Sequence, residues 1–224
     1  MRDNRLALRL AHTVLAICTP IVLLLGNLYL LASPWYLRHE YSRPSFPRSS
    51  IFSPDERLSL AEATLNYMRS GQDVSFIEKL SAQGRSVYNY REVVHLADAK
   101  RVMNAAFLVH GVAVAIVLLS ALTIWYLSKG WSSALQSMAR GCIGFFLMMM
   151  AIGVFAYAQF DRFFTLFHRL LFTGDSWLFP YTDTLIQLFP LPFWMDATYI
   201  LALLTLGQCV AVGIVGLIFS RAQG

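Results

Sequence analysis

Four long apolar runs divide this chain, and they limit its possible folds more than any other feature. The runs cover residues 10–32, 102–127, 141–160 and 198–219. An α-helix needs about 20 apolar residues to cross the hydrocarbon core of a bilayer, and each run has that length. The whole chain is 57% hydrophobic and only 14% charged, which is typical of a polytopic membrane protein. We predict an all-α membrane bundle, a single membrane domain with four transmembrane helices and short extracytoplasmic interfacial helices.

Two long connections, residues 33–101 and 161–197, separate these runs. In the first, Ser53 and Pro54 followed by two acids are typical of a helix start, and Gly71 is typical of its end. A second amphipathic helix is predicted over residues 73–83. Both helices are too small to form a core of their own. We therefore expect them to lie on the membrane surface, packed against the bundle.

The densest polar cluster lies in residues 88–100, YNYREVVHLADAK. Glu92, His95 and Asp98 recur every three residues, which places them on one side of a helix that continues into the second run. A histidine between two carboxylates near the membrane boundary is suited to proton transfer. The same pattern also fits a polar cap on a membrane helix, with the two acids paired to neighbouring basic residues: Arg91, Lys100 or Arg101.

A second cluster, DRFFTLFH, directly follows the third run. Asp161, Thr165 and His168 share one helical face, and the phenylalanines around them indicate contact with lipid or an acyl chain. An aromatic belt at the membrane interface is the alternative explanation. Since His95 and His168 each stand at the end of a different span, we expect both to line one membrane-facing cleft. A gap of about 5–8 Å would suit an acid and a base that flank one reacting atom.

The distribution of basic residues predicts the orientation. Arg2, Arg5 and Arg9 precede the first run, and the short loop at 129–140 is also basic. Basic flanks of short loops favour the cytoplasmic side, whereas long loops translocate largely regardless of charge. We predict a multi-pass membrane protein with cytoplasmic N- and C-termini and both histidines at the outer leaflet.

Several function classes find no support in the sequence. The three cysteines lie far apart within apolar runs, and no phosphate-binding loop or metal-ligand motif is present. The basic residues are scattered, so no nucleic-acid partner is expected. Two function classes stay open at this point: a metal-dependent membrane lipid hydrolase that uses both histidines, and a non-catalytic membrane assembly partner.

Four stretches together resemble a known family. SPDERLSLAEATLNYM, YNYREVVHLADAK, DRFFTLFHRLLFTGDSWLF and DTLIQLFPLPFW are similar, in order and spacing, to the lipoprotein intramolecular transacylase (Lit) family of four-span bacterial membrane proteins. The resemblance implies a substrate, a lipoprotein whose N-terminal Cys carries an S-diacylglyceryl group. It also implies a reaction, transfer of the sn-2 acyl chain to the α-amino group of that Cys, giving the lyso-form lipoprotein. We expect a monomer in contact with membrane lipid, without a cofactor or metal.

The chemistry of this transfer assigns roles to the two clusters. A histidine is a suitable base for an α-amine with a pKa of about 8, and a second can protonate the departing alkoxide. We predict His95 and His168 as this pair. The candidates that orient an imidazole or stabilise the oxyanion are Glu92, Asp98, Asp161, Arg91, Arg162 and Tyr88. The candidates that line the acyl-chain chamber are Phe163, Phe164, Phe167, Phe172 and Trp177.

The sequence generates a prediction that separates the transacylase from the metal hydrolase. The purified protein should convert a diacylated lipopeptide to its N-acyl lyso form in the presence of a chelator, because its two candidate histidines belong to no metal-ligand motif. Mass spectrometry is the measurement, since an intramolecular shift conserves mass. Chelator-sensitive release of fatty acid with a free N-terminus would contradict the prediction, because a metal-activated water gives that product.

Overall fold

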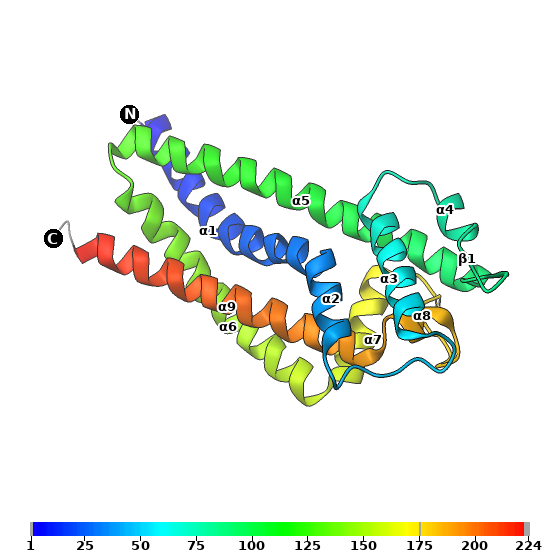
Figure 1. Ribbon diagram of the computed structural model, residues 1–224. Helices are drawn as coiled ribbons and strands as arrows, with labels where there is room; N and C mark the ends of the chain where they lie inside the picture. The colour runs from blue at the N-terminus through cyan, green and yellow to red at the C-terminus, as the bar shows by residue number, and fades with distance from the viewer. Residues whose placement is uncertain (1, 175, 222–224) are drawn as a thin grey trace. The chain divides into compact units, whose positions relative to one another are not determined.

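The computed structural model describes residues 2–174 and 176–221 and contains four long apolar helices. They are α1 (Arg2–Leu31), α5 (Tyr90–Ser128), α6 (Ser132–Ala158) and α9 (Leu191–Arg221), drawn in Figure 1. Only 17–22% of the most apolar window of each helix is buried inside the protein. Such an exposed apolar surface is stable in lipid and not in water. The predicted all-α fold with four membrane-spanning helices is confirmed.

The chain separates into two compact units. The first consists of Met1–Leu28, Ala106–Tyr157 and Ile200–Gly224, and the second of Tyr29–Ala105 and Ala158–Tyr199. Both α5 and α9 contribute one part to each unit. Both candidate histidines belong to the second unit.

Small residues and a few polar contacts hold the helices of the first unit together. A Cβ atom at Gly141 on α6 would lie 1.9 Å from the carbonyl oxygen of Ala16 on α1, so only glycine permits this approach. Elsewhere Asn27 on α1 donates hydrogen bonds to Thr205 and Gln208 on α9, both at 3.0 Å. Close backbone packing and interhelical hydrogen bonds are the usual forces between helices in lipid.

The second unit is built from short elements around the N-terminal parts of α5 and α9. These elements are α2 (Pro34–Ser42), α3 (Pro54–Arg69), α4 (Ser75–Glu78), β1 (Ser81–Ala82), β2 (Arg85–Ser86), α7 (Phe160–Leu171) and α8 (Thr184–Leu188). The start of α3 is as predicted, because the Ser53 side chain accepts a hydrogen bond from the backbone N–H of Glu56. Helix α2 was not predicted, and Ser33 caps it in the same way.

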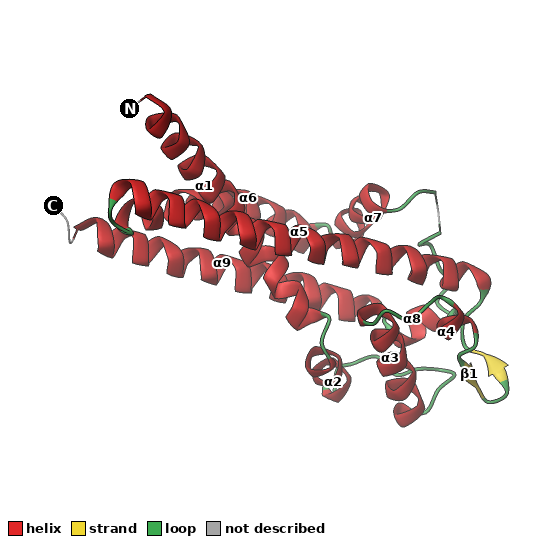
Figure 2. Ribbon diagram, turned by 90° about the horizontal axis from the view of Figure 1, so that it is seen from above, coloured by secondary structure: helices red, strands yellow, loops and turns green. Residues whose placement is uncertain are grey.

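The predicted helix over residues 73–83 is wrong. Only the single turn α4 is helical there, and β1 and β2 form an antiparallel hairpin, which Figure 2 draws in yellow. Between the strands, Gln83 and Gly84 have positive φ angles of 53° and 75°. Two successive positive φ angles form the tight turn that matches the twist of a two-stranded hairpin, and they are incompatible with a right-handed helix. The Gln-Gly pair therefore overrides the amphipathic pattern of the preceding residues.

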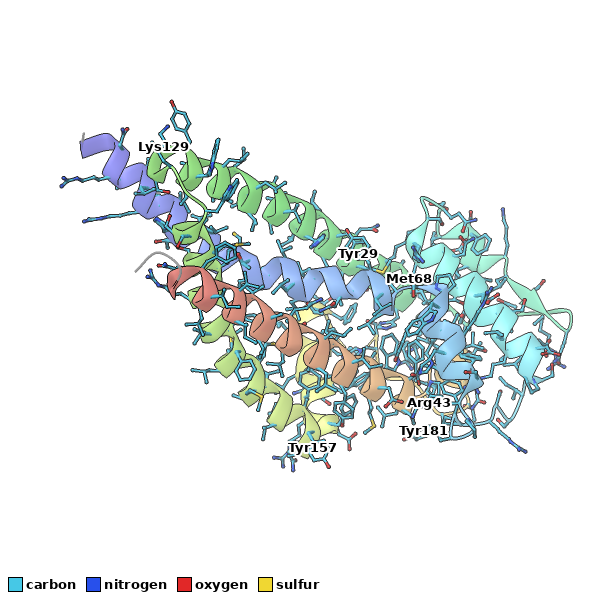
Figure 3. All side chains as sticks on the ribbon, turned by 60° about the vertical axis from the view of Figure 1, so that its left-hand side comes forward. Tyr29, Arg43, Met68, Lys129, Tyr157 and Tyr181 are labelled. Carbon is cyan, nitrogen blue, oxygen red and sulfur yellow. The ribbon has the colours of Figure 1, made fainter. Side chains whose placement is uncertain are left out.

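A buried carboxyl group anchors α2 to the start of α9. Glu40 is only 1% exposed, and Arg43, labelled in Figure 3, donates to its Oε2 at 3.0 Å and also pairs with Asp196. The hydroxyl of Tyr36 donates to the backbone carbonyl of Phe193 at 2.9 Å. Burial raises the pKa of Glu40, and the neighbouring Asp196 carboxylate adds to this effect although Arg43 opposes it. Burial and the second acid outweigh the arginine, so the pKa of Glu40 lies above its ordinary value.

This cluster predicts a pH dependence of stability. Because the pKa of Glu40 is higher in the folded protein than in the unfolded chain, the folded state binds more protons, and its advantage is lost as the pH rises through the folded-state pKa. Glu40→Gln should remove this loss, so its thermal unfolding temperature in detergent should fall less with rising pH than that of the wild type. Glu78→Gln, which alters an exposed acid on α4, is the control and should follow the wild type. Equal pH slopes for the wild type and Glu40→Gln would contradict the prediction.

Candidate active site

The second unit brings the two predicted histidines together. His95 lies on α5, one turn after its start, and His168 lies near the end of α7. Their ring centroids are 6.1 Å apart, and the ring planes are inclined by 22°. Both side chains are buried, with 9% and 8% of their surface exposed. The expected proximity of the two histidines is therefore present, and both rings lie in the same buried part of the second unit.

Aromatic rings surround this pair. Trp177 lies 4.9 Å from His168 and Phe172 lies 4.9 Å from His95, measured between ring centroids. Phe164, Phe172, Trp177 and Phe179 together form what we call the aromatic box. Phe167 touches the outer side of His168 at 5.4 Å and is 47% exposed. Phe163, also on α7, is tilted against Phe160, with ring centroids 6.0 Å apart.

The tautomer of His168 follows from one hydrogen bond. Its Nδ1 lies 2.8 Å from the carbonyl oxygen of Phe164, which is an acceptor only, so Nδ1 carries the proton. Burial lowers the pKa of His168, and this hydrogen bond only partly offsets the effect. The ring is therefore neutral near pH 7, with the lone pair on Nε2. That is the form in which a histidine acts as a general base.

His95 differs in its hydrogen bonding. Its Nδ1 is buried and has no hydrogen-bond partner among the described residues. An unsatisfied buried nitrogen costs about 1–3 kcal/mol, and such atoms in native proteins often mark functional sites. The rings of Phe172 and Phe179 pack against His95, and their carbon atoms cannot form a hydrogen bond with this nitrogen.

Glu92 is fully engaged with the backbone. Its Oε2 accepts from the N–H of Asn89 at 2.8 Å, while the Asn89 side chain accepts from the N–H of Glu92 at 3.1 Å, a reciprocal capping box at the start of α5. Its Oε1 accepts from the N–H of Leu185 at 2.6 Å, at the start of α8. Glu92 thus ties α8 to α5 one turn before His95.

The other polar candidates either contact groups outside the histidine pair or are exposed at the surface. Asp98 pairs with Arg101 on the same helix, as the polar-cap interpretation anticipated. Asp161 and Arg162 are exposed in the first turn of α7. Arg91 donates to the carbonyl oxygen of Leu178 at 2.5 Å, and its guanidinium lies 5.9 Å from the ring centroid of Phe179.

Tyr88 is buried away from solvent. Its hydroxyl lies 2.5 Å from the Thr64 Oγ1, and Thr64 in turn donates to the carbonyl of Leu60 at 2.8 Å. The Tyr88 proton is therefore directed at Thr64, and burial raises its pKa. In this arrangement Tyr88 packs α3 against the segment that leads into α5.

Two contributors were missed by the sequence analysis. Phe179 completes the aromatic box but lies outside the helical motifs that drew attention to the other rings. Asn89 caps α5, and its spacing of three residues from Glu92 is a visible capping-box pattern. Within the described chain, no group of three or more His, Cys, Asp or Glu side chains is arranged to hold a metal ion.

Comparison with known proteins gives this site a family. Residues 13–194 match the family model described as lipoprotein intramolecular transacylase Lit. The chain belongs to the Lit family. It is thus an acyltransferase and a multi-pass membrane protein. An uncharacterized protein of Aquifex aeolicus is 28% identical over 221 residues, which cover 96% of this chain and 99% of that protein.

Solved structures of a Lit protein have the same fold. The in meso structure of the membrane-integral Lit of Bacillus cereus matches 99% of this chain and 98% of its own, with a TM-score of 0.77 and 17% sequence identity. Two variants of that protein, with one histidine replaced by arginine or by alanine, match with TM-scores of 0.70 at 18% identity. The matches cover 94% of the arginine variant's chain and 96% of the alanine variant's chain.

The contacts of Glu92 predict how this Lit protein responds to Glu92→Gln. An amide has one acceptor oxygen, so one of the two backbone N–H groups would face an NH₂ group and lose its partner. We expect a loss of about 1–3 kcal/mol of stability, seen as a lower thermal unfolding temperature in detergent. Unchanged stability together with lost activity would contradict this prediction and would favour a direct role in orienting an imidazole.

Proposed function

We propose that this Lit protein moves the sn-2 acyl chain of an S-diacylglyceryl lipoprotein to the α-amino group of its N-terminal Cys. The amine nitrogen forms a bond to the ester carbonyl carbon, and the bond from that carbon to the glycerol oxygen breaks. The nitrogen loses a proton and the departing alkoxide gains one. Since an amide is more stable than an ester, the reaction needs no energy source, cofactor or outside acyl donor.

The observation that carries this proposal is the pair of buried histidines inside the aromatic box. A base and an acid are both required, and two imidazoles with ring centroids 6.1 Å apart supply them in one place. His168 suits the role of base, because its hydrogen bond to Phe164 leaves Nε2 with the lone pair. His95 would then protonate the alkoxide with the proton that His168 takes from the amine, because burial lowers the pKa of His95 to about 4 and leaves its ring neutral at the start. The box excludes water, which would otherwise compete for the acyl group.

The position of the substrate follows from the same surroundings. Acyl chains are apolar, and the exposed face of α7 presents Phe167 and Leu170, which are 47% and 83% exposed. Helix α7 begins two residues after α6 ends, at the boundary of a membrane span. We therefore propose that the substrate's lipid lies along α7 with its ester beside His168. Arg91 and Arg162 are candidates for contacting the oxyanion or the glyceryl oxygens.

The membrane orientation is part of the proposal. Three arginines precede the apolar run at residues 10–32, and Lys129 and Arg140 lie close to the start of α6, so we place both termini in the cytoplasm. The histidine pair then faces the outer leaflet, where mature lipoproteins are anchored. We propose that one copy of the chain is sufficient, because both histidines and the aromatic box come from the same chain.

This function predicts the behaviour of two alanine variants. His95→Ala and His168→Ala should each reduce N-acylation of a diacylated lipopeptide by at least about 100-fold, since general acid–base catalysis contributes on that scale. The product is measured by mass spectrometry and by its amide, which resists mild base. His39→Ala is the matched control, because His39 stacks on Trp35 in α2, outside the aromatic box.

The same variants also test the structural alternative. Both should remain in the membrane fraction and unfold in a single transition, because the removed rings pack against the aromatic box of the second unit and not among the helices of the first unit. Full activity in either variant would remove that histidine from the mechanism. Loss of the folded protein in both would support a purely structural role for the pair.

A further inference from the structure

A buried arginine lies on α3, outside the proposed catalytic pair. Arg57 is only 5% exposed, and the described residues provide no carboxylate within ion-pair distance of it. Its Nε donates to the carbonyl oxygen of Gln187 at 2.6 Å, and its Nη1 donates to the carbonyl oxygen of Pro47. The guanidinium lies over the rings of Tyr41 and Phe46, at 5.1 and 4.8 Å from their centroids.

Burying a cation without a counter-ion is unfavourable, so these contacts must offset a large desolvation cost. Only arginine fits this position, because its planar fork donates to two carbonyl groups in different directions while both faces remain free for aromatic rings. The two carbonyls belong to segments far apart in the sequence. Arg57 therefore fastens the loop after α2 to the end of α8.

Gln187 strengthens the same junction with its side chain. Its Oε1 accepts from the Ser49 hydroxyl at 2.9 Å and from the backbone N–H of Ser50 at 3.0 Å. Its Nε2 donates to the carbonyl of Tyr181 at 2.7 Å. Nearby, the hydroxyl of Tyr41 donates to the carbonyl of Leu188 at 2.7 Å. We call Arg57 and Gln187, with these contacts, the latch.

The latch acts on the segment that supplies half of the aromatic box. Residues 177–189, here called the wall segment, begin with Trp177 and Phe179, which pack against His168 and His95. Glu92 holds the middle of this segment through Leu185, and the latch holds its end at Gln187. Few residues of the wall segment are in regular structure, because α8 is only five residues long. Its position therefore depends on these external hydrogen bonds.

We propose that Arg57 and Gln187 are positioning residues that hold the wall segment against the two histidines, and so decide whether the acyl group goes to the amine or to water. This inference rests on the proposed transacylase function. Neither residue touches the reacting atoms. Their effect is on the space beside the ester, which must admit the α-amine and exclude water.

The competing reaction defines the readout. In hydrolysis, water oxygen bonds to the ester carbonyl carbon, the bond to the glycerol oxygen breaks, and the alkoxide takes up a proton. The products are a free fatty acid and a monoacylglyceryl lipopeptide with a free amine. The ratio of this product to the N-acyl lipopeptide is measured per turnover. It is therefore independent of how much enzyme is folded, and a merely structural defect would leave it unchanged.

The test compares Arg57→Lys with the wild type on a diacylated lipopeptide in detergent, with mass spectrometry of both products. Lysine keeps the charge and can lie over the same rings, but its single ammonium group does not reproduce the fork that binds both carbonyls. We expect the hydrolysed fraction to rise about tenfold or more, because a displacement of about 1 Å is sufficient to disturb catalytic geometry. Arg38→Lys is the matched control, since Arg38 pairs with Glu62 at the surface and contacts neither loop nor wall segment.

A second variant keeps the test decisive if Arg57→Lys fails to fold. Gln187→Ala removes the side-chain contacts to Ser49, Ser50 and Tyr181 but leaves the backbone carbonyl in place. It should raise the hydrolysed fraction as well. If both single variants fold, the double variant should show less than the product of their effects, because both residues hold one junction.

The outcomes separate the latch from the proposed function. An N-acyl product from the wild type, with more hydrolysis in the latch variants alone, supports both. An unchanged product ratio in every folded latch variant, even with slower turnover, overturns the latch while leaving the transacylase function standing. Fatty acid as the only wild-type product overturns the proposed function and the latch with it.

Discussion

Two imidazoles that pack against each other in an apolar box can hold only one positive charge without a large penalty. Two unit charges 6 Å apart repel by roughly 3 kcal/mol at an effective dielectric constant of about 20. Burial opposes even the first charge, as the lowered pKa of His168 indicates. For acyl transfer this constraint is useful. A pair that starts neutral and shares a single proton can accept it from the amine on one side and deliver it to the alkoxide on the other.

Such a pair needs rigid surroundings, because the Phe164 carbonyl is the only hydrogen-bond partner of either ring among the residues that the structure describes. The structure supplies rigidity from outside the box. Glu92 fixes the start of α8, and Arg57 fixes its end. Both charged groups are buried, and both contact backbone groups instead of opposite charges. Polar atoms of the chain are thus used to place aromatic rings around the two imidazoles.

Periodicity made the helices and the histidine pair predictable, whereas the wall segment has no such signal. His95 and His168 were found because each belongs to a polar face at a helical spacing beside an apolar run. Phe179 and Gln187 lie in a segment with only one helix, of five residues, so their positions depend on partners distant in sequence. Arg57 followed the acidic start of α3 and resembled an ordinary exposed basic residue. The hairpin at Gln83–Gly84 was not predicted, because the apolar pattern of the preceding residues favoured a helix and gave no sign of two successive positive φ angles.

Glu92 illustrates how one spacing supports two interpretations. Its distance of three residues from both Asn89 and His95 fits a capping box and also a carboxylate that orients an imidazole. Its Oε2 accepts from the N–H of Asn89 and completes the capping box, and its Oε1 accepts from the N–H of Leu185, so both oxygens contact backbone groups. The choice between the two interpretations depends on Leu185, whose backbone N–H approaches the Glu92 carboxylate only in the folded chain. No sequence pattern around residue 92 contains that information.

The length of α5 explains how a proton-transfer site and a membrane span share one helix. With 39 residues and a rise of about 1.5 Å per residue, α5 is roughly 58 Å long, whereas the hydrocarbon core measures about 30 Å. Its C-terminal half is sufficient to cross the membrane. The N-terminal half then extends beyond the hydrocarbon and carries Glu92, His95 and Asp98. On α7 the exposed Leu170 and Phe167 still require an apolar environment, so that helix belongs at the level of the acyl chains. An ester bond lies between the acyl chains and the polar surface of a lipid. With one histidine on each of these two helices, the proposed site is therefore matched in depth to the ester bond that the proposed reaction breaks.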